Sequence, residues 1–222
     1  FDGAVNQSTY RDVTGQGIPP GLLSISDAPL FNFGTIAVNS TRTFALTVSN
    51  IGGATTTAMS GGGLVAPFAY FGGAYPGTGG TCGLSLAPGS DCTVVVEFAP
   101  TVINSYVDTV EIDYDNGIGP QVSTRDVQGS GAAPALLGIS LGPTFNFAQR
   151  ALGSTADQVF VVTNSGGVYA TGMTGVGLAA PYVYTGGSYP GTGGTCGASL
   201  APTLTCTISV SFTPTVVGIF ND

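Results

Sequence analysis

The chain has 222 residues, of which 43% are hydrophobic and only 7% are charged, and its formal net charge is −8 at pH 7. It has four basic residues, all arginine, and no histidine. Nucleic acids and anionic lipids are bound through cationic surfaces, so this composition excludes both as partners. The absence of histidine and lysine also excludes histidine-based triads and lysine Schiff bases.

The rest of the composition indicates the fold class. Short runs rich in Val, Thr, Ile, Phe and Tyr alternate with turns drawn from 36 Gly and 14 Pro. This pattern is typical of an all-β protein with a real core. No apolar run reaches the length of a membrane span, so we expect no membrane insertion in this segment. Because it begins at Phe1, we interpret it as a mature or excised part of a longer precursor.

Six segments are predicted to be strands. Several alternate apolar and polar residues with period 2, as at Phe44, Leu46 and Val48. Together with further short strands between Gly and Pro turns, they favour an immunoglobulin-like β-sandwich. In chain order the predicted strands are 22–26, 31–38, 42–50, 91–98, 105–115 and 123–131.

The sequence repeats itself with a shift of 114 residues, since "FNF" at 31–33 recurs at 145–147. The stretch "YPGTGGTCG" likewise occurs twice, at 75–83 and 189–197. The repeat predicts tandem sandwich domains, with a frame that begins inside one. Residues 1–17 match 115–131 and are predicted to be the final strand of a preceding or neighbouring repeat. Residues 18–131 form one complete repeat, and residues 132–222 form a second that lacks its last strands.

A sandwich without its last strands leaves apolar core and backbone groups open to water. Either the next repeat supplies the missing strands covalently, or a neighbouring molecule donates its residues 1–17. In the second case only the equivalents of 109–114 are absent from the composite domain. Both alternatives predict a head-to-tail polymer whose partner is the protein itself. The predicted inter-subunit strand comprises Ser8, Thr9, Tyr10, Arg11, Asp12 and Val13.

The four cysteines form two local pairs, Cys82 with Cys92 and Cys196 with Cys206. A Pro-Gly turn inside the first pair lets the chain double back, so each pair is predicted to be a disulfide. The competing interpretation, a zinc site, needs more ligands than two thiols and has no histidine available. Disulfides persist in oxidising compartments, which predicts a location outside the cytoplasm.

The stretch "FGTIAVNST…FALTVSNIGGA…GGTCG-SLAPGSDCTVVVEFAPT…GSG" resembles the bacterial repeats named choice-of-anchor D, relatives of the ASH (abnormal-spindle/hydin) type of immunoglobulin-like domain. The second copy departs from this pattern at "FNFAQRALGST" and "APTLTC". The resemblance implies an exported, repetitive protein at the bacterial cell surface or outside the cell. It implies no enzymatic activity and no cofactor.

Two kinds of chemistry can be drawn from the acidic residues. A glycosidase-type pair needs two facing carboxylates, whereas these charges lie mostly along strands, where they discourage aggregation. We therefore expect no catalytic residue. "DYDNG" at 113–117 could offer calcium ligands through Asp113, Asp115 and Asn116. A turn with Asn-Gly at its tip explains the same letters, and we expect no metal site.

The candidate ligand contacts are aromatic residues of the Gly-rich loops, because Tyr rings bind glycans and proteins well. They are Tyr70, Phe71, Tyr75, Tyr184 and Tyr189. The spacing of Phe68 and Tyr70 also fits core packing. The sequence thus predicts a non-enzymatic structural block of a secreted surface fibre, filament or stalk. The alternative is an adhesin module that binds glycan or protein through these loops.

Overall fold

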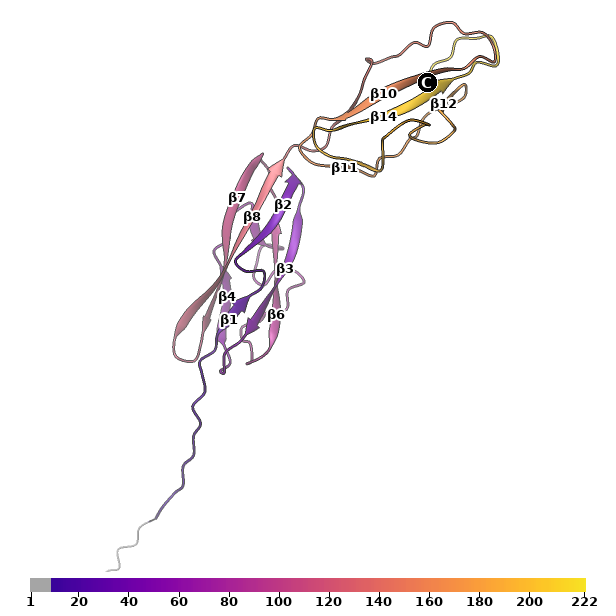
Figure 1. The fold of residues 1–222 in the computed structure, drawn as a ribbon. Coiled ribbons are helices and arrows are strands. Elements are labelled where there is room, and N and C mark those ends of the chain that lie inside the picture. The colour runs from indigo at the N-terminus through magenta and orange to yellow at the C-terminus, as the bar shows by residue number, and fades with distance from the viewer. Residues whose placement is uncertain (1–8) are drawn as a thin grey trace, which may run out of the picture.

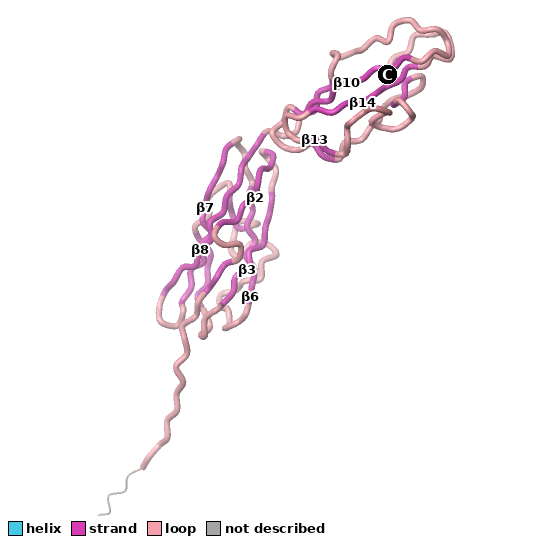
Figure 2. Tube along the Cα trace, in the orientation of Figure 1, coloured by secondary structure: helices cyan, strands magenta, loops and turns pink. Residues whose placement is uncertain are grey.

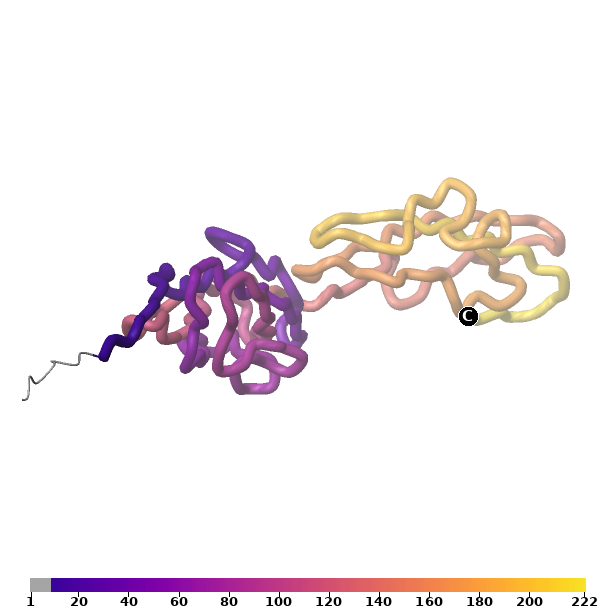
Figure 3. The backbone as a smooth tube through the Cα atoms, turned by 90° about the horizontal axis from the view of Figure 1, so that it is seen from below, coloured from indigo at the N-terminus to yellow at the C-terminus, as the bar shows by residue number. Residues whose placement is uncertain are grey.

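The computed structural model describes residues 9–222 and shows an all-β chain made of two units and an N-terminal arm (Figure 1). The arm comprises residues 9–20, the first unit residues 21–132 and the second unit residues 133–222. The arm projects away from the first unit in both views (Figures 1 and 3). Within the described part of the chain there is no helix that could cross a membrane.

One sheet of the first unit has the order β1-β3-β6-β5, and all of its pairs are antiparallel. Its central pair joins β3 to β6, with Leu46 opposite Val94. In both central strands the inward residues are buried and the outward ones are more exposed, as the period-2 pattern predicts. The four strands are β1 (Leu23–Ile25), β3 (Arg42–Asn50), β5 (Phe68–Tyr70) and β6 (Asp91–Phe98).

The other sheet has the order β2-β8-β7-β4. The strands β7 and β8 form a long antiparallel hairpin, from Asn104 opposite Gly131 to Asp115 opposite Pro120. The strand β2 joins β8 in parallel, which is the one parallel pairing among the described residues. The strands are β2 (Leu30–Ala37), β4 (Thr57–Gly62), β7 (Asn104–Asp115) and β8 (Pro120–Ala132).

The two sheets enclose an apolar core between their facing sides. An aromatic trio lies at its centre: Phe68 stacks on Phe98 with ring centroids 4.8 Å apart, and Phe33 lies 5.8 Å from Phe98. None of the three is more than 1% exposed. Burial of three phenylalanine rings contributes several kcal/mol of hydrophobic stabilisation. The first unit is therefore a closed immunoglobulin-like β-sandwich, as the sequence predicts.

A buried asparagine organises the turn after β3. The side chain of Asn50 accepts hydrogen bonds from the backbone N–H groups of Leu22 and Gly52. It donates to the carbonyls of Ala54 and Leu86. In the second unit the side chain of Asn164 makes the same four bonds, to the residues 114 positions further on. The repeat thus preserves a complete polar network as well as an apolar pattern.

The second unit reproduces one sheet of the first. Its order is β12-β14-β10-β9, which corresponds strand for strand to β5-β6-β3-β1. A separate two-stranded pair, β11 with β13, corresponds to the isolated bridge between Thr56 and Leu86. The strands are β9 (Leu137–Ile139), β10 (Ala156–Asn164), β11 (Ala170–Thr171), β12 (Tyr182–Tyr184), β13 (Ser199–Leu200) and β14 (Thr205–Phe212).

The second unit has no counterpart of the β2-β8-β7-β4 sheet. Residues 144–151, which correspond to β2, form no strand, and loops replace the sheet in Figure 2. More is therefore missing than the last strands alone. The cause lies in the pairing of β2, which bonds only to β8 in the first unit. Without a strand in the place of β8, residues 144–151 have no ladder to join.

Residues 9–17 of the arm, which are predicted to form a final strand, form no strand here. Their side chains are exposed, with Tyr10 at 89% and Val13 at 86%. Ser8, the first residue of the predicted inter-subunit strand, lies outside the described residues. The arm ends where the N–H of Gly21 donates to the carbonyl of Asn116, in the turn between β7 and β8.

Candidate functional site

Both predicted disulfides are confirmed. Cys82 bonds to Cys92 with their Cα atoms 4.8 Å apart, and Cys196 bonds to Cys206 with 4.9 Å. All four residues are buried, and no free cysteine remains in the described chain. Each bond ties a Gly-rich loop to the start of a central strand, β6 or β14. Such bonds are stable in oxidising surroundings, which indicates an extracellular location.

Tyr70, one of the candidate ligand contacts, belongs to the core and not to a contact surface. It is 7% exposed, and its hydroxyl donates to the carbonyl of Glu111 at 2.9 Å. Burial, followed by the proximity of Tyr75, raises the pKa of Tyr70 far above its ordinary value. The prediction of a ligand role for Tyr70 is wrong because period 2 places it on the same inward face as Phe68.

The other candidate aromatic residues lie at the margin of the sandwiches. Phe71 is 37% exposed. Tyr75 packs edge-on against Tyr70 at 5.7 Å, and burial raises its pKa to about 12. Tyr184 and Tyr189 repeat this edge-on pair at 5.6 Å, with both rings half-buried. These loops offer ring edges to a partner, beside hydroxyl pairs such as Thr81 with Thr93 and Thr185 with Ser209.

The acidic turn at 113–117 is occupied by its own hydrogen bonds. A carboxylate oxygen of Asp115 accepts from the N–H of Gly117 at 2.7 Å. The side-chain oxygen of Asn116 accepts from the N–H groups of Ile118 and Gly119. No three His, Cys, Asp or Glu side chains of residues 9–222 are grouped to hold a metal ion. These contacts correspond to the turn interpretation of this motif.

The feature that sets the second unit apart is the incompletely covered inner side of its sheet, which we call the open face: Phe212 is buried at 6% exposure, while Phe147 and Tyr182 are half-buried. The open face carries the counterpart of the core trio: Tyr182 stacks on Phe212 at 4.9 Å, and Phe147 lies 5.5 Å from Phe212. The cluster is thus already assembled. It lacks the cover that its counterpart receives from β7 and β8. Phe160, in the position of the fully buried Leu46, is partly exposed.

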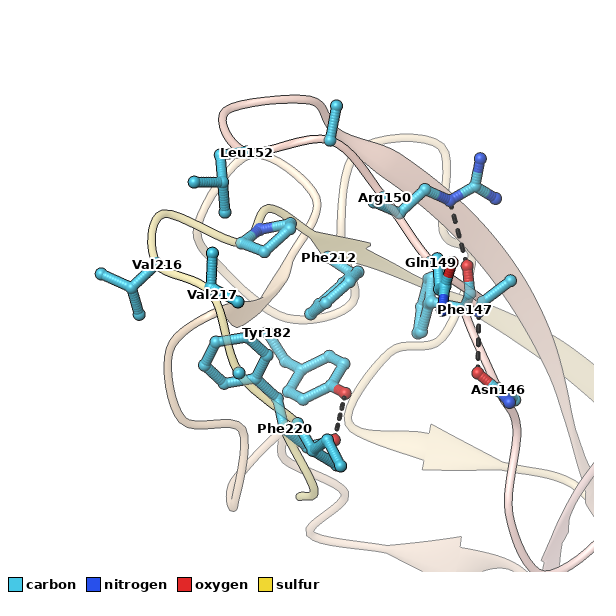
Figure 4. A pocket seen from close by; sticks show the side chains of 15 residues that line it. Asn146, Phe147, Gln149, Arg150, Leu152, Tyr182, Phe212, Val216, Val217 and Phe220 are labelled. Atoms are coloured by element: carbon cyan, nitrogen blue, oxygen red, sulfur yellow. Dashed lines mark hydrogen bonds between the residues drawn. The ribbon is translucent and has the colours of Figure 1, made fainter.

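Two adjacent hollows run along the open face. One has a volume of about 800 Å³ and is lined by Phe147, Tyr182, Phe212 and Phe220, with the loop at 214–219 beside it (Figure 4). The other, of about 530 Å³, shares three of these rings and continues past Phe160 toward Ile139. Phe212, Pro214 and Val216, which line the larger hollow, correspond to Phe98, Pro100 and Val102, the residues that lie against β8 in the first unit.

The end of the chain already takes the place of the beginning of β7. The carboxylate of Asp222 accepts from the N–H of Ala179 at 2.8 Å, just as Asp108 accepts from Val65 at 2.8 Å. The ring of Phe220 lies 6.1 Å from Phe212, where Tyr106 lies 5.9 Å from Phe98. At the border of the open face formed by residues 218–222, the contacts of Phe220 and Asp222 are therefore the same as those of Tyr106 and Asp108 in the first unit.

The other border keeps its polar contact by a different residue. In the first unit the guanidinium of Arg42 donates to the carbonyl of Phe33. The second unit has Ala156 in the place of Arg42, and Arg150 donates to the carbonyl of Phe147 instead, at 3.0 Å. Because the equivalent carbonyl is satisfied in both units, segment 144–151 stays beside the hollow although it forms no strand.

No sequence-family model matches the chain, and no curated protein matches it in sequence. Among solved structures it is similar to the ASH/PapD-like domain 7 of human CEP192, with 16% identity and a TM-score of 0.40 over 59% of this chain and 99% of that one. It is also similar to the VesB protease of Vibrio cholerae, with 20% identity and a TM-score of 0.40 over 49% of this chain and 31% of that one. The chain therefore spans about a third of the protease. These are distant likenesses at the level of the fold.

Proposed function

We propose that the chain is a non-enzymatic structural building block of a secreted bacterial surface fibre, filament or stalk. Its immunoglobulin-like units follow one another head to tail, and an incomplete unit is completed by a strand from the next repeat or from a neighbouring subunit. The resemblance to choice-of-anchor D repeats supports the bacterial, surface-exposed setting. The two disulfides support the extracellular part of the proposal.

A single observation carries the proposal. The first unit forms two four-stranded sheets, whereas the second forms one four-stranded sheet and the two-stranded pair β11-β13, so that its aromatic cluster is only partly covered. Exposed apolar faces of this kind mark sites where another chain or segment binds. A unit whose core is completed by another chain or repeat is suited to form a linear polymer.

Electron microscopy of the native material tests the proposal. We expect linear assemblies whose axial repeat corresponds to a pair of immunoglobulin-like units. Native material that consists of isolated particles, with no linear array, would contradict the structural role. Loss of binding of the dye ANS when the chain assembles would report that the open face is covered.

The second candidate function is an adhesin module that binds glycan or protein through its Tyr-rich loops. It is favoured by the exposed ring of Phe71 and by the half-buried pair Tyr184 and Tyr189. Binding to a glycan array or a host surface should then fall at least tenfold in Phe71→Ala and Tyr189→Ala. Tyr70→Ala is no test of this idea, because that side chain lies in the core. Unchanged binding in both loop variants would eliminate this candidate.

A further inference from the structure

The open face corresponds to the position of β8, so its occupant should resemble β8 in sequence. Arm residues 11–17, "RDVTGQG", match residues 125–131 of β8, "RDVQGSG", at five of seven positions. We infer that the arm of a second copy of this chain fills the open face as a β8-like strand. This inference rests on the proposed function, and it names the occupant, the register and the residues that decide the fit.

The repeat fixes the register of the donated strand. In the first unit β2 and β8 pair in parallel, with Phe31 opposite Val127 and Asn32 opposite Gln128. The corresponding pairs are Phe145 with Val13 of the second copy and Asn146 with Thr14 of the second copy. On its other side, β8 pairs with the beginning of β7, whose place residues 218–222 already take. Arm residues 13–17 therefore find backbone partners on both sides.

Two glycines of the arm support this assignment. A Cβ atom at Gly129 of β8 would lie 2.6 Å from the ring of Phe98, and one at Gly131 would lie 2.6 Å from the carbonyl oxygen of Val102. Both positions thus require glycine because β8 crosses the core closely. Their counterparts in the arm, Gly15 and Gly17, have no atom within 4 Å. Their surroundings in the free arm impose no such requirement, whereas the open face does.

The open face supplies the same neighbours that these glycines need. Phe98, Pro100 and Val102 have Phe212, Pro214 and Val216 as their counterparts, identical in type. All three line the larger hollow. In the proposed register, Gly15 of the second copy crosses over Phe212 and Gly17 passes Pro214, so the two glycines enter where a side chain would collide.

Polar and apolar contacts of β8 can also be reproduced. Arg125 donates to the carbonyl of Ile25, and the hydroxyl of Ser123 donates to the carbonyl of Leu23 at 3.1 Å. Arg11 and Thr9 carry the same donor groups at the corresponding positions. They would reach the carbonyls of Ile139 and Leu137 in β9, of which Ile139 lines the smaller hollow. Val13 takes the place of Val127, which is fully buried.

The decisive experiment measures self-association of the full 222-residue chain by analytical ultracentrifugation. We expect head-to-tail oligomers whose average mass increases with concentration. Gly15→Val should weaken association at least tenfold, because the added branch collides with Phe212. The matched control is Thr14→Val, which adds the same branched side chain on the outward side and should change association less than twofold. Both residues lie in the exposed arm, so circular dichroism should show both variants folded.

A cross-linking experiment tests the register directly. The described part of the chain has no free thiol, so a Thr14→Cys chain and an Asn146→Cys chain can be mixed and oxidised. We expect a mixed dimer in high yield, and a much lower yield when Asn146→Cys is replaced by Thr213→Cys at a more distant site. A wild-type chain that stays monomeric, or equal association of Gly15→Val and Thr14→Val, would overturn the inference.

The two proposals can fail separately. Linear native assemblies together with an unaffected Gly15→Val variant would leave the structural role standing and refute the arm as the occupant. Arm-dependent association in vitro without any array in the native material would support the occupant and refute the proposed function.

Discussion

Replacement of the buried asparagine after β3 is the sharpest test of how these units are held together. Asn50 is 1% exposed and its side chain makes four hydrogen bonds to backbone groups. In Asn50→Ala all four groups lose their partner. At about 1 kcal/mol for each of the four bonds, the loss should be about 4 kcal/mol, and more where a group stays buried without water. That is a large fraction of the total stability of a domain of this size.

The assay should report each unit separately within the intact chain. Urea-dependent hydrogen–deuterium exchange of β3 and β10, read by mass spectrometry, does this. Asn50→Ala should destabilise β3 and leave β10 nearly unchanged, and Asn164→Ala should do the reverse. Asn32→Ala serves as the matched control, since its side chain makes a single exposed hydrogen bond, to the N–H of Gly34. A loss below about 1 kcal/mol in Asn50→Ala would refute the reasoning, because it would mean that water satisfies these groups.

Three further predictions concern the disulfide, alkaline pH and calcium. Cys82→Ser with Cys92→Ser should cost the first unit about 3 kcal/mol, or roughly 10 °C in Tm by calorimetry; a change under 3 °C would contradict a stabilising role. Above pH 10 the unfolded chain ionises Tyr70 and Tyr75 while the folded unit keeps both protonated, so stability should fall with rising pH. Tyr70→Phe should flatten this decline, and an equally steep decline would count against it. Calcium or a chelator should leave Tm unchanged because the oxygens of Asp115 and Asn116 are engaged in the turn; a rise of several degrees with calcium would show otherwise.

Strands with local alternation could be predicted from the sequence. The predicted ranges 42–50 and 91–98 coincide with β3 and β6, because inward Leu46 and Val94 alternate with polar neighbours. The strand β4 was not predicted. Its sequence "TAMSGG" has no such alternation, and it becomes a strand only through irregular pairing with β7 at the edge of the sheet. Pairing, and not propensity, decides the state of such a segment.

The candidate site shows the same distinction. The truncated repeat predicts that something must cover the second unit, but not which side chains form the uncovered surface. "FNF" forms β2 in the first unit and no strand at 145–147, although the letters are identical. The difference comes from a partner strand far along the chain. Likewise the role of Gly129 becomes apparent only when the ring of Phe98 is placed against it.

The parallel pairing of β2 with β8 has a consequence for how a unit acquires its structure. Leu30 pairs with Asp126, which lies 96 positions later in the chain, so β2 cannot form its backbone hydrogen bonds until that residue is in place. Such non-local contacts slow folding, since a long loop must close before they form. During synthesis from the N-terminus, β2 therefore stays unpaired until almost the whole unit has been made. If the final strand arrives from another molecule, this last step becomes second order, and the rate at which a unit closes depends on the concentration of its neighbours.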